Sequence, residues 1–240
     1  MSILQCAGIR FGVSQKPYNF RATEGNAPAS AAHRFLSEIG ATADSVWFMD
    51  QTHSDHVRIV PTHHARPYYG EYIVADCDAL ITDKKHIALV SRVADCTPIL
   101  LYDPVQQVQA CIHSGWRPTL ARIAKKAAAA LRTHYGTEPS DLYAFIGPTI
   151  GKDSFQVGNE VSALWRDAFD FAESVITYDD PTHDYIDIRE TNRRILLEAG
   201  VLPARIAIDP ADTMTDRRYH SYRNRTGDDY GTNALVSVLV

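Results

Sequence analysis

The sequence predicts an α/β (α+β) fold, a single-domain sandwich in which helices cover a mixed β-sheet. Nine short runs rich in branched and aromatic residues are typical of strands. The early runs follow one another directly and the later ones alternate with helical patterns, which favours a mixed sheet over a doubly wound one. The 240 residues are 45% hydrophobic and 22% charged, as in globular proteins. We therefore expect one domain over residues 1–240, although this length also allows two fused halves.

Four segments carry apolar residues at helical spacing. They are Ala29–Ile39, Pro118–Tyr135, Asn159–Phe171 and Asp187–Gly200. Pro118 suits a first helical turn and Gly136 suits a helix end. Asp187 and Glu190 have the form of a capping box. In the third segment we expect Leu164 to lie on the buried face with the neighbouring tryptophan.

The expected strands lie between these helices. They are Val46–Met49, Val57–Val60, Ala79–Thr82, Ile87–Val93, Ile99–Tyr102, Val108–Ile112, Leu142–Ile146, Arg205–Ile208 and Ala234–Leu239. The segment Pro61–Gly70, with two histidines and two tyrosines, is typical of an exposed loop. No change in composition marks a domain boundary.

Charge and cysteine content exclude several classes of protein. A net charge of -5 argues against a nucleic-acid-binding surface. The one basic cluster, Arg217 and Arg218 with Arg223 and Arg225, is interpreted as a small anion site. Neither a secretory signal nor an apolar run of about 20 residues is present, so we expect a cytoplasmic protein without membrane contact. Four cysteines without CxxC spacing favour neither disulfides nor a zinc ribbon. Nothing indicates the oligomeric state.

Three reactive residues lie near the ends of expected strands: His53, Cys96 and His113. Thiolate and imidazole ligands suit zinc, and three protein ligands leave a fourth position for a water whose pKa the metal lowers. A cysteine and a histidine brought together by folding also suit a nucleophile and its base. Asp78 and Asp95 could orient a ligand histidine or cap turns. The sequence alone leaves these alternatives open.

Several signatures of other enzymes are absent. The chain has no HExxH, no HxE with CxxC, no GxSxG, no P-loop and no GxGxxG. Its ten histidines form no HxH pair of the kind that lines a multicopper cluster. Metallopeptidases, ordinary zinc deaminases, α/β-hydrolases, NTPases and dinucleotide enzymes are therefore disfavoured.

Seven segments, taken in order, resemble a bacterial family. They are Gln51-Thr52-His53, Asp78-Ala79, Ala94-Asp95-Cys96-Thr97-Pro98, His113-Ser114-Gly115-Trp116-Arg117, Ile146-Gly147-Pro148, Phe155-Gln156-Val157-Gly158-Asn159-Glu160-Val161 and Ser221-Tyr222-Arg223. The chain resembles the YfiH family over nearly its whole length. That family is also called the laccase-domain or multicopper polyphenol oxidoreductase family and is described as purine nucleoside phosphorylase.

The resemblance implies a zinc ion held by His53, Cys96 and His113, with copper as the other candidate metal. It also implies phosphorolysis of adenosine, guanosine or inosine, and methylthioadenosine, with adenosine deamination as a second activity. The expected partners are thus a purine nucleoside and phosphate. Arg117 and Arg223 would hold the phosphate, because guanidinium groups suit tetrahedral oxyanions; their alternative is a surface ion pair.

The sequence departs from the family pattern at several places. The N-terminal segments Arg10–Ser14 and Pro17–Arg21 are altered, and a loop expected to contact substrate lies there. Pro118 and Thr149 replace the usual residues, and Gly227–Asp229 replaces the arginine that commonly follows in a threonine-glycine-arginine pattern. These departures predict either a changed choice of substrate or a weakened activity, with the metal site retained.

Other functions remain open at this point. A cysteine hydrolase that edits peptidoglycan precursors would use Cys96 as nucleophile and His113 as base. A metal-binding protein without turnover would retain the ligands alone. Copper-dependent oxidation of polyphenols is a further alternative, because copper exceeds zinc in intrinsic affinity. Tightly bound metal would argue against the hydrolase.

Overall fold

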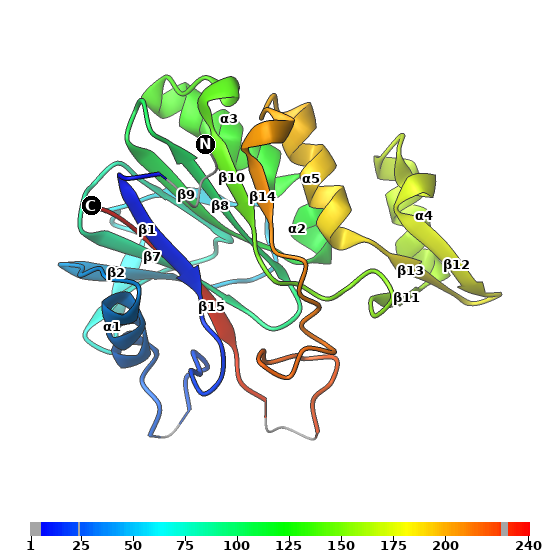
Figure 1. Ribbon diagram of the computed structural model, residues 1–240, viewed down its shortest axis with the longest axis horizontal. Coiled ribbons are helices and arrows are strands. Elements are labelled where there is room, and N and C mark those ends of the chain that lie inside the picture. Colours follow the sequence, from blue (N-terminus) through cyan, green and yellow to red (C-terminus); the bar gives the residue numbers. More distant parts are fainter. Residues whose placement is uncertain (1–5, 24, 227–229) are drawn as a thin grey trace.

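The structure, a computed structural model, describes residues 6–23, 25–226 and 230–240. Two six-stranded sheets stack face to face, and helices cover both outer faces (Figure 1). The α/β sandwich with mixed sheets and helices is therefore confirmed, with its strands divided between two large sheets. Among the described residues, no helix combines the length and apolar character needed to cross a bilayer.

Sheet 1 contains both the first and the last strand of the described chain. Its order is β1 (Ile9–Val13), β15 (Asn233–Leu239), β7 (Ile87–Val93), β2 (Ser45–Met49), β5 (Glu71–Val74) and β4 (Ala65–Tyr68). Strand β2 pairs in parallel with both of its neighbours, and the other pairs are antiparallel. The last strand of the chain thus lies inside the sheet, between β1 and β7.

Sheet 2 packs against sheet 1. Its order is β14 (Ile206–Ile208), β10 (Tyr143–Ile146), β8 (Thr97–Asp103), β9 (Val108–Ser114), β6 (Ala79–Thr82) and β3 (Val57–Ile59). Strands β10 and β14 pair in parallel, as do β3 and β6, while the remaining pairs are antiparallel.

The central strands are apolar throughout because both of their faces are covered. Along β8, Ile99 and Leu101 pack beneath the helices, while Leu100 and Tyr102 pack between the two sheets. Side chains of a strand alternate between faces, so a continuous apolar run supplies both layers. The expected strands β6 and β7 have the predicted bounds.

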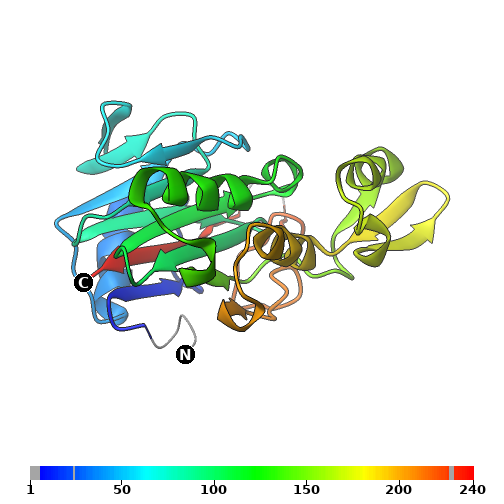
Figure 2. The same ribbon diagram turned by 90° about the horizontal axis from the view of Figure 1, so that it is seen from above.

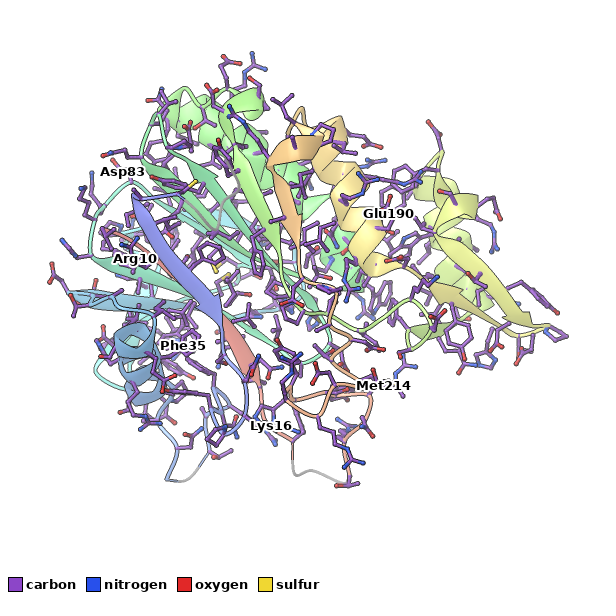
Figure 3. All side chains as sticks on the ribbon, viewed as in Figure 1. Arg10, Lys16, Phe35, Asp83, Glu190 and Met214 are labelled. Carbon is purple, nitrogen blue, oxygen red and sulfur yellow. The ribbon has the colours of Figure 1, made fainter. Side chains whose placement is uncertain are left out.

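Helices form the two outer layers. Helix α1 (Pro28–Glu38) covers sheet 1, and α3 (Ile123–Tyr135) and α5 (Ile188–Glu198) cover sheet 2 (Figures 1 and 2). Figure 3 labels Phe35 on α1, and its buried ring packs against sheet 1. Short 3₁₀ helices within the described residues connect larger elements, at Pro139–Asp141, Ala172–Ser174 and Pro203–Arg205.

The expected helix Pro118–Tyr135 is wrong as one element. It is divided into α2 (Trp116–Leu120) and α3, and Arg122 between them has a left-handed φ of 59°. The guanidinium of Arg122 pairs with Glu198 and donates a 2.8 Å hydrogen bond to the carbonyl of Ala168. These tertiary contacts favour the break over the helical tendency of the local sequence.

Two other helices also differ from expectation. Helix α4 (Asn159–Ala168) ends before Phe171, and Leu164 is 45% exposed rather than buried. At the start of α5, Asp187 accepts a 2.8 Å hydrogen bond from the amide of Glu190. The carboxylate of Glu190 bonds to two arginines one turn later, so only half of the expected capping box forms.

The expected loop Pro61–Gly70 contains an edge strand, which corrects that prediction. Strand β4 pairs with β5 through a turn at Tyr69 and Gly70, both with positive φ, as in type I′ hairpins. Strand β1 and the small sheet were not expected either. That sheet consists of β11 (Gln156–Gly158), β13 (His183–Ile186) and β12 (Ile176–Asp180), and with α4 it projects from the sandwich (Figures 1 and 2).

Candidate metal centre and cationic cavity

Two chain connections cross from sheet 1 to sheet 2 at the same end of the sandwich. His53 lies on the connection from β2 to β3, and Cys96 lies on the connection from β7 to β8. His113 is the last residue but one of β9 in sheet 2. The candidate ligand atoms of these three residues lie within 4.8 Å of one another. Folding thus brings together the three residues singled out in the sequence.

The spacing and chemistry of the triad fit a tetrahedral metal. The Sγ atom of Cys96 lies 3.8 Å from Nε2 of His53, close to the edge of about 3.6 Å that zinc–ligand distances give a tetrahedron. Gly115 closes one side: a Cβ there would lie 2.9 Å from Cys96 Sγ and 2.9 Å from His53 Cδ2. The donor set is one thiol and two imidazoles, which suits zinc or copper.

Asp78 fixes the orientation of His113. This fully buried carboxylate lies 2.7 Å from Nδ1 of His113, and its backbone carbonyl accepts the amide of His113 at 2.7 Å. It also accepts hydrogen bonds from the amide of His53 at 3.2 Å and from Ser54. A carboxylate on Nδ1 leaves Nε2 for a metal, the arrangement common behind ligand histidines.

Cys96 and His113 shift each other's pKa values. Burial alone would raise the pKa of Cys96, but the charge and hydrogen bonds of His113, and those of His53, lower it to about 6. Burial likewise opposes the charge on His113, yet Cys96 and Asp78 raise its pKa to about 9. The metal-free protein therefore favours a thiolate–imidazolium pair near neutral pH. A thiolate is the form that binds metal and also the form that attacks electrophiles.

Asp95 occupies a different place from the one expected of a residue that orients a ligand histidine. Its carboxylate accepts hydrogen bonds from Thr213 at 2.7 Å, from Ser221 at 2.9 Å and from the amide of Arg223 at 2.7 Å. None of its hydrogen bonds within the described residues reaches a histidine. Asp95 therefore connects the Cys96 turn to the segments that precede β15.

A cavity of about 730 Å³ opens onto the triad, and its lining is strongly cationic. Four arginines line it: Arg21, Arg92, Arg117 and Arg223. Asp95 is the only carboxylate among the described lining residues, and its oxygens already accept three hydrogen bonds. The rest of the wall is largely aromatic or aliphatic, with Trp116, Phe155, Tyr222, Tyr230, Ile150 and Ile188. The cavity thus suits an anion together with a planar apolar group.

Arg117 and Arg223 both face this cavity. Arg117 lies in the first turn of α2, with its guanidinium 4.2 Å from the ring centre of Trp116. It is exposed and forms no ion pair with any described residue. Arg223 donates a 2.9 Å hydrogen bond from Nη2 to the carbonyl of Gln156 and lies over Phe155. Neither charge is neutralised by a carboxylate in the part of the chain that the structure describes.

The expected anion cluster of four C-terminal arginines is divided by the fold. Arg218 pairs with Asp216 at 2.6 Å, and Arg225 stacks on Tyr222 with 3.7 Å to the ring centre. Of the four, only Arg223 lines the cavity, and this corrects the expectation. The departure at Gly227–Asp229 lies outside the described residues.

Sequence reasoning missed two cationic lining residues. Arg92 ends in hydrogen bonds to the hydroxyl of Tyr68 and the carbonyl of Met49. Arg21 lies over the ring of Tyr230 at 4.0 Å. Arg21 belongs to the altered N-terminal segment, so the departure from the family pattern there was the one available signal.

Comparisons with known proteins agree with this arrangement. A family model described as multi-copper polyphenol oxidoreductase laccase matches residues 8–239. The chain is 28% identical over 225 residues to "Purine nucleoside phosphorylase YlmD" of Bacillus subtilis, covering 90% of this chain and 81% of that protein. It is 33% identical over 172 residues to "Adenosine deaminase RL5" from an unknown prokaryotic organism, covering 70% and 65% respectively. The crystal structure of YlmD from Geobacillus stearothermophilus matches with a TM-score of 0.87 at 24% identity, covering 98% of this chain and 93% of that chain.

Proposed function

Because the chain belongs to the multi-copper polyphenol oxidoreductase laccase family, we propose that it is a zinc-dependent purine nucleoside phosphorylase. Its substrates would be adenosine, guanosine or inosine, and methylthioadenosine, with adenosine deamination as a side activity. The observation that carries the proposal is a cationic cavity with an aromatic wall that opens directly onto a His–Cys–His triad. The names of the curated relatives support the same activities.

Different residues of the cavity bind the phosphate, the purine and the metal. Arg117 and Arg223 bind phosphate, since each presents a guanidinium without a carboxylate partner among the described residues. The aromatic wall receives the purine. His53, Cys96 and His113 hold the metal, and Asp78 keeps the ring of His113 in position. Zinc in this triad would supply a Lewis acid and lower the pKa of a bound water. We also propose that residues 1–240 act as one catalytic domain.

One observation favours a second candidate function. The pKa of Cys96 is lowered to about 6 beside His113, which is how a cysteine nucleophile is activated. A cysteine hydrolase acting on peptidoglycan precursors would use Cys96 as nucleophile and His113 as base. This hydrolase requires a metal-free thiolate, whereas the phosphorylase requires the loaded triad, so metal content separates the two.

The first experiment combines metal analysis with product analysis. Protein purified without added metal should contain about one zinc per chain, and adenosine with phosphate should give adenine and ribose-1-phosphate. Cys96→Ala and His113→Ala should each lose zinc and phosphorolysis while the circular dichroism spectrum is preserved. His134→Ala, on the exposed face of α3, is the control and should keep both. Full zinc occupancy in both triad variants would show that the metal site is wrongly placed.

Arg117 provides a test of the phosphate site. Arg117→Ala should leave zinc bound and reduce the phosphate-dependent kcat/KM about 10- to 100-fold, as expected for a charge-assisted contact worth about 1.5–3 kcal/mol. Deamination of adenosine, which needs water and no phosphate, should fall much less. Arg132→Ala is the matched control, because Arg132 is likewise an exposed arginine but lies on α3, outside the cavity lining. An unchanged phosphate dependence would remove Arg117 from the site.

A further inference from the structure

Asp95 is a buried residue that directly precedes the candidate ligand Cys96, but its carboxylate bonds to a different part of the chain. It is 9% exposed and has a left-handed φ of 82°, in the turn that joins β7 to β8. Its Oδ1 atom accepts the hydroxyl of Thr213, and its Oδ2 atom accepts the hydroxyl of Ser221 and the amide of Arg223. Its backbone carbonyl accepts the amide of Ile150 at 3.0 Å and the hydroxyl of Thr149.

These contacts join three separate segments at one residue. One segment follows β10, and the other two lie between β14 and β15, in the connection where Figure 3 labels Met214. This long connection contains no helix or strand in its described part. Single backbone hydrogen bonds, such as that from the amide of Thr213 to the carbonyl of Thr149 at 3.1 Å, and side-chain contacts hold it in place. Ionised carboxylates make the stronger class of hydrogen bond, and this one accepts three donors from the connection.

The position of Arg223 depends on this anchor. Asp95 holds its backbone amide at 2.7 Å, while the guanidinium is held by the carbonyl of Gln156 and the ring of Phe155. Arg223, which lines the cavity, is therefore held at both its backbone and its side chain. Because Asp95 directly precedes Cys96, one residue links the turn that carries the thiol of the triad to the segment that carries the guanidinium of Arg223.

We propose that Asp95 is a positioning residue that sets the distance between the metal centre and the anion site by holding Arg223. The inference rests on the proposed function, in which Arg223 binds phosphate. The carboxylate of Asp95 is engaged by Thr213, Ser221 and the amide of Arg223, and it bonds to no histidine among the described residues. Its effect passes through the Arg223 segment and is expected in phosphate binding rather than in metal binding.

The test uses Asp95→Asn in the zinc-loaded protein. An asparagine keeps the shape but presents an NH₂ group to one set of donors, so the Arg223 segment loses part of its anchor. The KM for inorganic phosphate should rise about tenfold, while kcat at saturating phosphate stays within about twofold and zinc remains bound. Zinc loss, or a fall in kcat with an unchanged phosphate KM, would instead show that Asp95 supports Cys96 and would overturn the proposal.

A double-mutant cycle tests the route of the effect. If Asp95 acts through Arg223, Asp95→Asn should raise the phosphate KM no further in an Arg223→Ala background. Independent, additive effects of the two substitutions would contradict the proposal. If Asp95→Asn does not fold, Ser221→Ala removes one of the three donors and should shift the phosphate KM in the same direction by a smaller factor.

Two measurements separate this inference from the proposed function. Calorimetric titration with inorganic phosphate reports anion binding without turnover, and Asp95→Asn should weaken it about tenfold. Trypsin should also cut faster after Arg223 in Asp95→Asn, because the segment is released. The wild-type protein could lack phosphorylase activity while Asp95→Asn still weakens phosphate binding and speeds the tryptic cut. That result would overturn the phosphorylase and keep the positioning role. Unchanged phosphate affinity in Asp95→Asn would overturn the positioning role alone.

Asp103→Asn is the matched control. Asp103 is also a buried carboxylate, at the opposite end of β8, where it accepts the amides of Val105 and Gln106. The same substitution there should lower stability without changing the phosphate KM, the phosphate affinity or the tryptic cut after Arg223. Equal changes in both variants would mean that general destabilisation, and not the anchor, causes them.

Discussion

Single residues of the triad depend on neighbours that are distant in the sequence. His113 is oriented by Asp78, and Cys96 is ionised by the two histidines. The ligands themselves were predictable, because thiol and imidazole groups at strand ends and the family motifs mark them. Their orientation was not, since it comes from hydrogen bonds between connections that only the folded sandwich brings together.

The reactivity of Cys96 should follow its shifted pKa. In metal-free protein the thiolate forms as the pH rises through about 6, so alkylation by iodoacetamide should reach half of its plateau rate near that pH. Rates measured by mass spectrometry from pH 4 to 10 would test this. Cys77 and Cys111 are internal controls, because burial raises the pKa of each to about 12.

Metal should suppress the reaction. In zinc-loaded protein, coordination engages the sulfur and Cys96 should be modified slowly across the whole range. A midpoint above pH 8 in the metal-free protein would contradict the proposed pairing of Cys96 with His113. Rapid alkylation despite stoichiometric zinc would mean that the metal is bound elsewhere.

Helices α2 and α4 are each preceded by a glycine, and one of these two glycines lies against the metal centre. Gly115 precedes α2 and Gly158 precedes α4, both with extended backbone. A Cβ at Gly115 would contact Cys96 and His53 at 2.9 Å, whereas the atoms nearest to one at Gly158 belong to the flexible carboxylate end of Glu160. The two positions thus offer a matched pair of substitutions.

Gly115→Ala should therefore impair the metal centre, whereas Gly158→Ala should not. Because two ligands must move apart, we expect zinc affinity to fall at least tenfold, as for other disturbances of ligand geometry. Competition with a chromophoric chelator would measure the zinc affinity. Thermal unfolding of the metal-free forms would measure how far each substitution lowers the stability of the fold. Equal zinc affinity in the two variants would show that the ligands yield easily.

Hydrophobic periodicity predicted those helices and strands whose apolar residues pack into the core. Helices α1 and α5 and strands β6 and β7 were found within a residue or two, because one apolar face or an apolar run is needed to bury them. The break at Arg122 was not predictable, since it depends on Glu198 and Ala168. The small-sheet strands were missed because they are short and carry polar residues, such as Asp179 and Asp180 in β12 and Asp184 in β13, in place of an apolar run.

The whole molecule is stabilised by the layer between the two sheets. Leu100 is fully buried there, and Leu100→Ala should lower the free energy of unfolding by about 2–5 kcal/mol. Leu164→Ala, at a leucine that the sequence placed in the core but that is 45% exposed, should change it by less than about 0.5 kcal/mol. Urea unfolding of the two variants would decide whether burial in the structure or the sequence pattern is the better guide.

The position of β15 has a consequence for the speed of folding. This strand, Asn233–Leu239, pairs with β1 on one side and with β7 on the other. Within the described residues β1 pairs with no other strand, so sheet 1 can take up its first strand only after its last strand is in place. Bringing together strands so far apart in the sequence closes a long loop, and such non-local pairing slows folding. We therefore expect the insertion of β15 to be a late step, with one edge of β7 uncovered until it occurs.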